Sequence, residues 1–228
     1  MNRELMMIYS KIMELKQLLL SEASLVEKMV AMSIDGLYKD AGQLLADVMV
    51  FETRVNQIEL ELEGKCTSTI ALFQPEAKDL RLILMIYKIN NDLERLGDQA
   101  VNIAESVEHL IGNPVIQELP ELKEMKDAAL AMLKDSLNAF AKEDVELARS
   151  VCNADNVVDD LNRRIYHHLV DLVKAEPSLT ERYLHLLRVA KNLERIGDLS
   201  TNIAENTFYL AEGRVIKHHS EDNPPQAD

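Results

Sequence analysis

Apolar residues recur every three or four positions along most of this chain, which is the spacing of one face of an α-helix. The first stretch carries them at Leu5, Ile8, Ile12, Leu15 and Leu19. Proline, glycine and short polar breaks divide the pattern into six long segments. We expect these helices at about residues 3–38, 41–73, 75–110, 120–141, 144–174 and 177–212. Long amphipathic helices joined by short connections favour antiparallel bundles.

The composition also favours an all-α fold. Glycine and proline, on which turns depend, supply only 7 and 6 of the 228 residues, and aromatic residues make up 4%. The abundant Leu, Ala, Met, Glu and Lys are helix formers. A hydrophobic content of 47% is typical of a globular protein and excludes a disordered chain.

Charge and cysteine usage narrow the function classes. The chain has 25 Lys and Arg against 39 Asp and Glu, a net charge of −14, and no basic stripe that would neutralise nucleic-acid phosphates. No segment approaches the ~20 apolar residues of a membrane span, and charges interrupt the N-terminal run that a signal peptide needs. Cys66 and Cys152 lack metal-binding spacing and are typical of a reducing compartment. We therefore expect a soluble cytoplasmic protein.

The chain repeats itself. Residues 93–105 read LERLGDQAVNIAE and residues 193–205 read LERIGDLSTNIAE, with nine of 13 positions identical at an offset of 100. A weaker match relates residues 52–56 to residues 155–159 at an offset of 103. Two homologous halves of three helices each explain both matches. We predict domains at residues 1–112 and 113–213, followed by a flexible tail at 214–228.

Each copy of the repeat carries a stripe of oxygen-bearing side chains on one helix face. At about 100° per residue, the stripes contain Glu94, Asp98, Asn102 and Glu105 in the first half and Glu194, Asp198, Asn202 and Glu205 in the second. Apolar residues occupy the opposite face, which should pack on the core. The carboxylates should therefore point toward solvent or a partner.

Both stripes carry energetic costs. Like charges at i and i+4, as in Glu94 and Asp98, repel by about 0.2–0.5 kcal/mol, and Gly97 and Gly197 each cost roughly 1 kcal/mol within a helix. A glycine allows close approach of a ligand, an ion or another helix, and a bound cation would relieve the repulsion. The alternative is a solvated acidic face, with Arg95 or Arg195 neutralising the neighbouring aspartate.

The residue types limit which metal such a stripe would hold. Carboxylate and amide oxygens without His or Cys suit hard ions such as Mg, Ca, Mn or iron. Further ligand candidates lie at i and i+4 on the preceding helix of each half: Glu52 and Asn56 in the first, Asp155 and Asp159 in the second. Di-iron enzymes of the ferritin type use Glu-x-x-His pairs, which this chain lacks.

No catalytic motif is present. The sequence has no phosphate-binding glycine loop and no nucleophile elbow, so we expect a protein that is not an enzyme. Because carboxylate–metal clusters can hydrolyse phosphoesters, a metal-dependent phosphohydrolase stays open as an alternative. A purely structural acidic bundle is the second alternative.

The duplicated LER[LI]GDxxxNIAE motif resembles that of the PhoU family of phosphate-uptake regulators. The likeness extends to LVEKMV at 25–30, to Phe73-Gln74-Pro75 and to VDDLNRRIYHHL at 158–169. The chief departure is Asn56, which stands opposite Asp159.

The resemblance implies two tandem three-helix bundles in a pseudo-twofold relation, often assembled as a homodimer. It implies multinuclear clusters of iron or zinc at the Glu-x-x-x-Asp motifs. It further implies a cytoplasmic adaptor that links the ATPase subunit of a phosphate ABC transporter to a phosphate-sensing histidine kinase, meets the membrane only through those partners, and negatively regulates phosphate uptake and phosphate-starvation genes.

Overall fold

The computed structural model describes residues 3–37, 41–111 and 119–213. Within these ranges the chain forms six α-helices, one short 3-10 turn and no strand, so the all-α prediction is confirmed. The elements are α1 (Arg3–Asp35), α2 (Ala41–Phe73), α3 (Ala77–Glu108), α4 (Pro120–Lys142), α5 (Val145–Ala175), η1 (Pro177–Leu179) and α6 (Thr180–Glu212). The predicted tail and the predicted boundary at residue 112 lie outside the described residues.

Two predicted helix starts differ from the structure. The third helix was expected from Pro75 but begins at Ala77, because Gln74 and Ala77 have positive φ values of 45° and 47° that turn the chain first. The sixth was expected from Pro177, where the chain instead forms the 3-10 turn that leads into α6. Both differences are local to the connections between helices.

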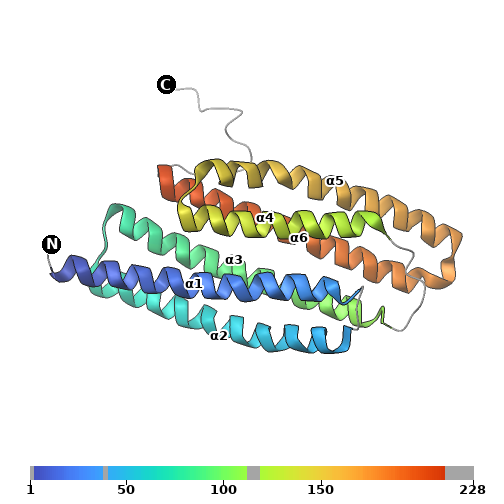
Figure 1. Ribbon diagram of the computed structural model, residues 1–228, viewed down its shortest axis with the longest axis horizontal. Helices are drawn as coiled ribbons and strands as arrows, with labels where there is room; N and C mark the ends of the chain where they lie inside the picture. Colours follow the sequence, from blue (N-terminus) through green and yellow to red (C-terminus); the bar gives the residue numbers. More distant parts are fainter. Residues whose placement is uncertain (1–2, 38–40, 112–118, 214–228) are drawn as a thin grey trace, which may run out of the picture.

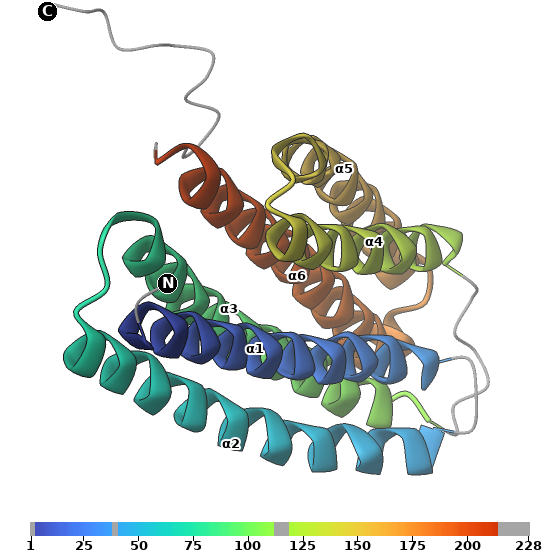
Figure 2. The ribbon, with the colours of Figure 1, turned by 60° about the vertical axis from the view of Figure 1, so that its left-hand side comes forward.

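The helices form two bundles of three. Helices α1, α2 and α3 pack on one another, as do α4, α5 and α6 (Figures 1 and 2). In the first bundle α1 and α3 run in the same direction and α2 runs against them (Figure 1). The apolar face of α1, including Leu15, Leu19 and Val26, is buried in this interior. The prediction of two three-helix bundles is confirmed.

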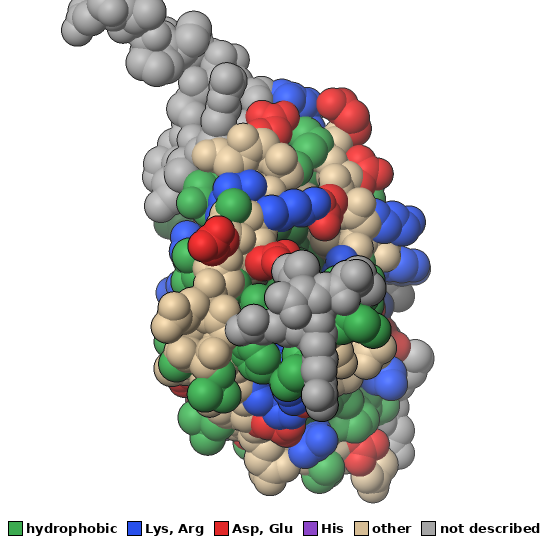
Figure 3. Space-filling model, turned by 90° about the vertical axis from the view of Figure 1, so that its left-hand side faces the viewer, with side chains coloured by type: hydrophobic (Ala, Val, Ile, Leu, Met, Phe, Trp, Pro, Cys, Tyr) green, Lys and Arg blue, Asp and Glu red, His purple; other side chains and the backbone are tan. Residues whose placement is uncertain are grey.

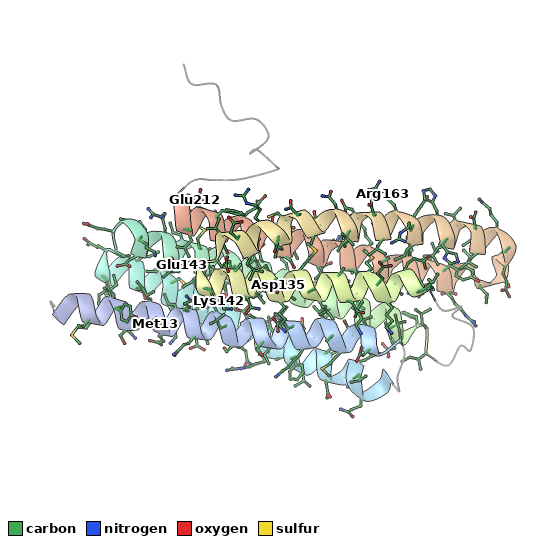
Figure 4. All side chains as sticks on the ribbon, turned by 45° about the horizontal axis from the view of Figure 1, so that its top comes forward. Met13, Asp135, Lys142, Glu143, Arg163 and Glu212 are labelled. Carbon is green, nitrogen blue, oxygen red and sulfur yellow. The ribbon has the colours of Figure 1, made fainter. Side chains whose placement is uncertain are left out.

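Two residues of the turn, Glu143 and Asp144, stabilise the connection between α4 and α5. Glu143 takes the left-handed conformation with φ 55° and ends α4 (Figure 4). Asp144 then caps α5, since its carboxylate accepts the backbone N–H of Leu147 at 3.0 Å. A capping carboxylate satisfies one of the free N–H groups of a first helical turn. This short turn keeps the two helices antiparallel.

The two bundles pack against each other through α3 with α6 and α1 with α4. Lys126 Nζ on α4 lies 2.7 Å from Asp35 Oδ1 on α1. Lys16 Nζ on α1 donates to the carbonyl oxygen of Ala141 at 2.7 Å. Polar contacts thus flank the packing between the bundles and fix their relative position.

The surface mixes charges of both signs. On the end of the molecule shown in Figure 3, acidic and basic side chains are interspersed among hydrophobic ones. In the described ranges, none of the helices carries an apolar run of the length that a membrane crossing needs.

Candidate functional site

The acidic stripe of the first bundle lies on α3, at its seam with α2. Asp98 is exposed, whereas Glu94 is half-buried and not fully turned to solvent. Burial raises the pKa of Glu94, and the charges of Asp98, of Glu59 and of Glu52 on α2 raise it further, against the opposing effect of Arg95. The structure therefore brings Glu52 close to the Glu94 and Asp98 pair. The electrostatic repulsion that the spacing of Glu94 and Asp98 predicts is therefore present in the structure.

The second bundle repeats this arrangement on α6. Asp198 is exposed as a whole residue, but partial burial of its carboxyl group raises its pKa. The charges of Glu194 and of Asp159 from α5 raise this pKa further. Glu194 accepts a hydrogen bond from Lys191, which stands beside the stripe. The two halves thus place a Glu-x-x-x-Asp pair next to an acidic residue of the preceding helix.

Asn102 and Glu105 of the first stripe lie at the contact between the bundles. Arg188 of α6 donates to Asn102 Oδ1 at 2.8 Å and to Glu105 Oε2 at 3.0 Å. Asn102 also donates to the carbonyl oxygen of Asp98 at 2.9 Å. These two residues therefore join the bundles, and Arg188 holds the oxygens that the stripe was expected to offer to a metal.

Asn202 and Glu205 of α6 lie opposite the N-terminal half of α3, at a different point along the same helix pair. They line a cleft of about 350 Å³ between α6 and α3, opposite Tyr87, Lys88 and Asp92. Lys88 is the counterpart of Arg188 at the repeat offset of 100. Both stripes thus divide into an acidic pair next to the preceding helix and an Asn–Glu pair at the contact between bundles.

The repeated glycines serve helix packing. A Cβ on Gly97 would lie 3.7 Å from Met29 Cε of α1 and 3.7 Å from Val55 Cγ1 of α2. A Cβ on Gly197 would lie 3.3 Å from Asp155 Oδ1 and 3.7 Å from Met132 Cε. Of the three roles that sequence left open, close approach of another helix is the one seen at both positions. At Gly197 the approaching side chain is itself a predicted ligand, Asp155.

The types of ligand in the stripes suit hard cations, but the side chains are not arranged around a common point. Carboxylate and amide oxygens are the ligands that Mg²⁺, Ca²⁺ and Mn²⁺ prefer, and the raised pKa values of Glu94 and Asp198 show crowded negative charge. In the part of the chain that the structure describes, however, no three His, Cys, Asp or Glu side chains converge as a metal-binding group. Metal binding at the stripes stays a prediction.

Sequence reasoning missed Glu22 on α1. Its side chain is fully buried, and neither carboxyl oxygen has a hydrogen-bond partner among the described residues. The signal was available, because Glu22 lies in the apolar register of α1 between Leu19 and Val26. An acidic residue at a core position of an amphipathic helix is unusual.

The fold and the duplicated acidic pairs define a class of all-α proteins built from two related three-helix bundles. The family profile described as "PhoU domain" matches residues 19–107 and again residues 122–207. The chain belongs to the PhoU family, as the resemblance of its motifs predicted.

Curated relatives align along almost the whole chain. A protein of Aquifex aeolicus is 35% identical over 93% of this chain and 96% of its own length, and one of Clostridium acetobutylicum is 35% identical over 91% and 95%. Each is named a phosphate-specific transport system accessory protein PhoU homolog.

Solved structures agree. The crystal structure of PhoU from Pseudomonas aeruginosa superposes with a TM-score of 0.87 at 32% identity, covering 90% of this chain and 99% of that one. The phosphate transport system regulatory protein PhoU from Streptococcus pneumoniae gives a TM-score of 0.85 at 26% identity, covering 92% and 100%.

Proposed function

We propose that this protein is a non-catalytic regulator of phosphate uptake. It would link the ATPase subunit of a phosphate ABC transporter to a phosphate-sensing histidine kinase in the cytoplasm, as a homodimer, and keep uptake and phosphate-starvation genes low when phosphate is plentiful. The observation that carries the proposal is the alignment with relatives named phosphate-specific transport system accessory proteins, which spans 93% and 91% of the chain.

The paired acidic surfaces support an adaptor role. Glu94 and Asp98 on α3 and Glu194 and Asp198 on α6 form two related patches on one rigid scaffold. Complementary charge gives specificity and speeds association. Two patches on two bundles would allow two basic partner surfaces to be held at once.

A metal at each patch is part of the proposal. In the first bundle Glu94, Asp98 and Glu52 would hold it, and in the second the ligands would be Glu194, Asp198, Asp155 and Asp159. Iron or zinc clusters, or Mg, Mn or Ca, are the candidates, and a bound cation would supply positive charge that relieves the repulsion within each pair. Asn102 and Glu105 would become metal ligands only after release from Arg188. Asn202 and Glu205 line the cleft between α6 and α3 and would become ligands only if their side chains rotated toward Asp198.

Deletion of the gene and complementation test the adaptor role. With phosphate in excess, the deletion strain should derepress a phosphate-regulated reporter, and the wild-type gene should restore repression. A Glu94→Gln/Asp98→Asn/Glu194→Gln/Asp198→Asn variant should fail to restore it and should lose the ATPase subunit and the kinase in pulldown. Its metal content after chelator-free purification should also fall.

A matched control removes four other negative charges. Glu76, Asp79, Asp127 and Glu146 are exposed and lie away from the stripes, so Glu76→Gln/Asp79→Asn/Asp127→Asn/Glu146→Gln should restore repression fully. An unchanged reporter in the deletion strain would contradict the adaptor role. Equal, sub-stoichiometric metal in wild type and stripe variant would contradict the metal centres alone.

A further inference from the structure

Glu22 lies inside the first bundle without a partner. Its side chain has 0% exposure, and neither of its two carboxyl oxygens has a hydrogen-bond partner among the described residues. A buried polar group without a partner destabilises the folded state. The charges of Glu59 on α2 and Glu94 on α3 act on this carboxyl group. Acidic side chains of all three helices thus lie in the same part of the bundle.

The side-chain amide of Asn90 lies at the same level of the bundle as Glu22. Helices α1 and α3 are parallel (Figure 1), and Met29 of α1 packs at Gly97 of α3. Glu22 and Asn90 each precede these residues by seven positions, which is two helical turns. Asn90 is 2% exposed and donates its Nδ2 to the carbonyl oxygen of Glu59 at 3.1 Å, while its Oδ1 is buried without a described donor.

The second bundle shows that the fold does not require these oxygens. Met29 and Met132 pack on the two equivalent glycines, so α1 and α4 correspond at an offset of 103. The same offset relates Glu52 to Asp155, and 100 relates α3 to α6. The counterparts of Glu22, Glu59 and Asn90 are accordingly Met125, Asn162 and Ala190. Met125 and Ala190 are fully buried apolar residues that serve the same core positions.

We propose that Glu22, Glu59 and Asn90 form a binding site for a hard divalent cation inside the first bundle. All the donors are carboxylate or amide oxygens, the ligand type of Mg²⁺, Ca²⁺ and Mn²⁺. A cation there would satisfy the unpaired oxygens of Glu22 and Asn90 together. The ligand set differs from that of the neighbouring surface patch, because it takes Glu22 from α1 and Asn90, which lies one helical turn before Glu94 on α3. The second bundle lacks it.

Among the described residues these carboxyl groups do not already converge as a metal-binding group. Glu22 and Glu59 reach a shared point by side-chain rotation, since glutamate has three rotatable bonds. Asn90 is already fixed by its bond to Glu59. Binding therefore requires no movement of the helices.

Titration of chelator-stripped protein with Mn²⁺ tests the site, with free Mn²⁺ followed by electron paramagnetic resonance. Wild type should bind one more Mn²⁺ per chain than Glu22→Met, which carries the residue of the second bundle. Asn90→Ala should weaken that site at least tenfold. Mn²⁺ should raise the Tm of wild type more than that of Glu22→Met. The reason is that an ion stabilises only a folded state that binds it.

Glu27→Gln is the matched control. Glu27 is a half-buried acid on the same helix whose charged neighbour is Lys134 of α4, so this variant should bind as wild type does. Metal at the surface patches would appear in wild type and Glu22→Met alike and cancels in the comparison. Equal Mn²⁺ stoichiometry and affinity in these two proteins, or no Mn²⁺ bound by either, would overturn the site, as would equal loss in Glu27→Gln.

Discussion

Among the acids of the described residues, Glu22 has the deepest burial and the most strongly raised pKa. Burial, with smaller contributions from the charges of Glu59 and Glu94, raises its pKa from 4.5 to about 9. Asp92 on α3 shows the same effect more weakly, since burial raises its pKa to about 6 against the attraction of Arg95. Burial disfavours the charged form of a carboxyl group. Glu22 is therefore neutral at pH 7 when no cation is bound.

This shift predicts a pH dependence of stability. Between about pH 5 and pH 9 the folded protein keeps a proton on Glu22 that the unfolded chain has released, so the free energy of unfolding falls as pH rises. The loss has a limit of about 1.4 kcal/mol per pH unit for one group. With chelator present, urea unfolding should show a steeper fall for wild type than for Glu22→Met. Parallel curves for the two proteins would refute the buried, protonated state.

Among the elements, α3 and α6 carry most of the functional features, and their glycines set how closely neighbouring helices approach. The surroundings of Gly97 and Gly197 differ. Around Gly97 a new methyl group would find ordinary contact distances of 3.7 Å, whereas at Gly197 it would meet Asp155 at 3.3 Å and Val158 at 3.4 Å. The second bundle is thus packed more tightly at this level than the first.

Alanine substitution separates helix propensity from packing. Because Ala is favoured over Gly by about 1 kcal/mol inside a helix, Gly97→Ala should raise the free energy of unfolding by roughly 0.5–1 kcal/mol. Gly197→Ala should gain less or lose stability, since Asp155 and Val158 must move. Urea unfolding at 25 °C measures both. A larger gain in the free energy of unfolding for Gly197→Ala than for Gly97→Ala would contradict the tighter packing inferred for the second bundle.

For the whole molecule, the contact between bundles decides whether the two halves act as one body. Helices α3 and α6 pack together along their length (Figure 2), and Arg188 bridges them to Asn102 and Glu105. On the other side Lys126 of α4 pairs with Asp35 of α1, with side chains only 16% and 29% exposed. We expect a single cooperative unfolding transition.

A double-mutant cycle with Lys126→Met and Asp35→Asn measures this contact. The coupling free energy should be about 1 kcal/mol, at the upper end for ion pairs near a surface. The exposed pair Lys174 and Asp171, within α5, is the control and should give at most about 0.5 kcal/mol. Equal coupling for both pairs would show that burial between the bundles adds nothing.

The six helices, the repeat and the family could be predicted from sequence alone, because helical periodicity and the spacing of LERxGD are properties of the chain in one dimension. The sequence also indicated the Glu-x-x-x-Asp pairs of both halves, since i and i+4 share a helix face. The neighbours across helices were decided only by the tertiary structure. Arg188 reaches Asn102 and Glu105, side chains of α1 and α2 pack at Gly97, and Glu22 is buried inside the first bundle. The rotation and separation of packed helices depend on all the side chains between them.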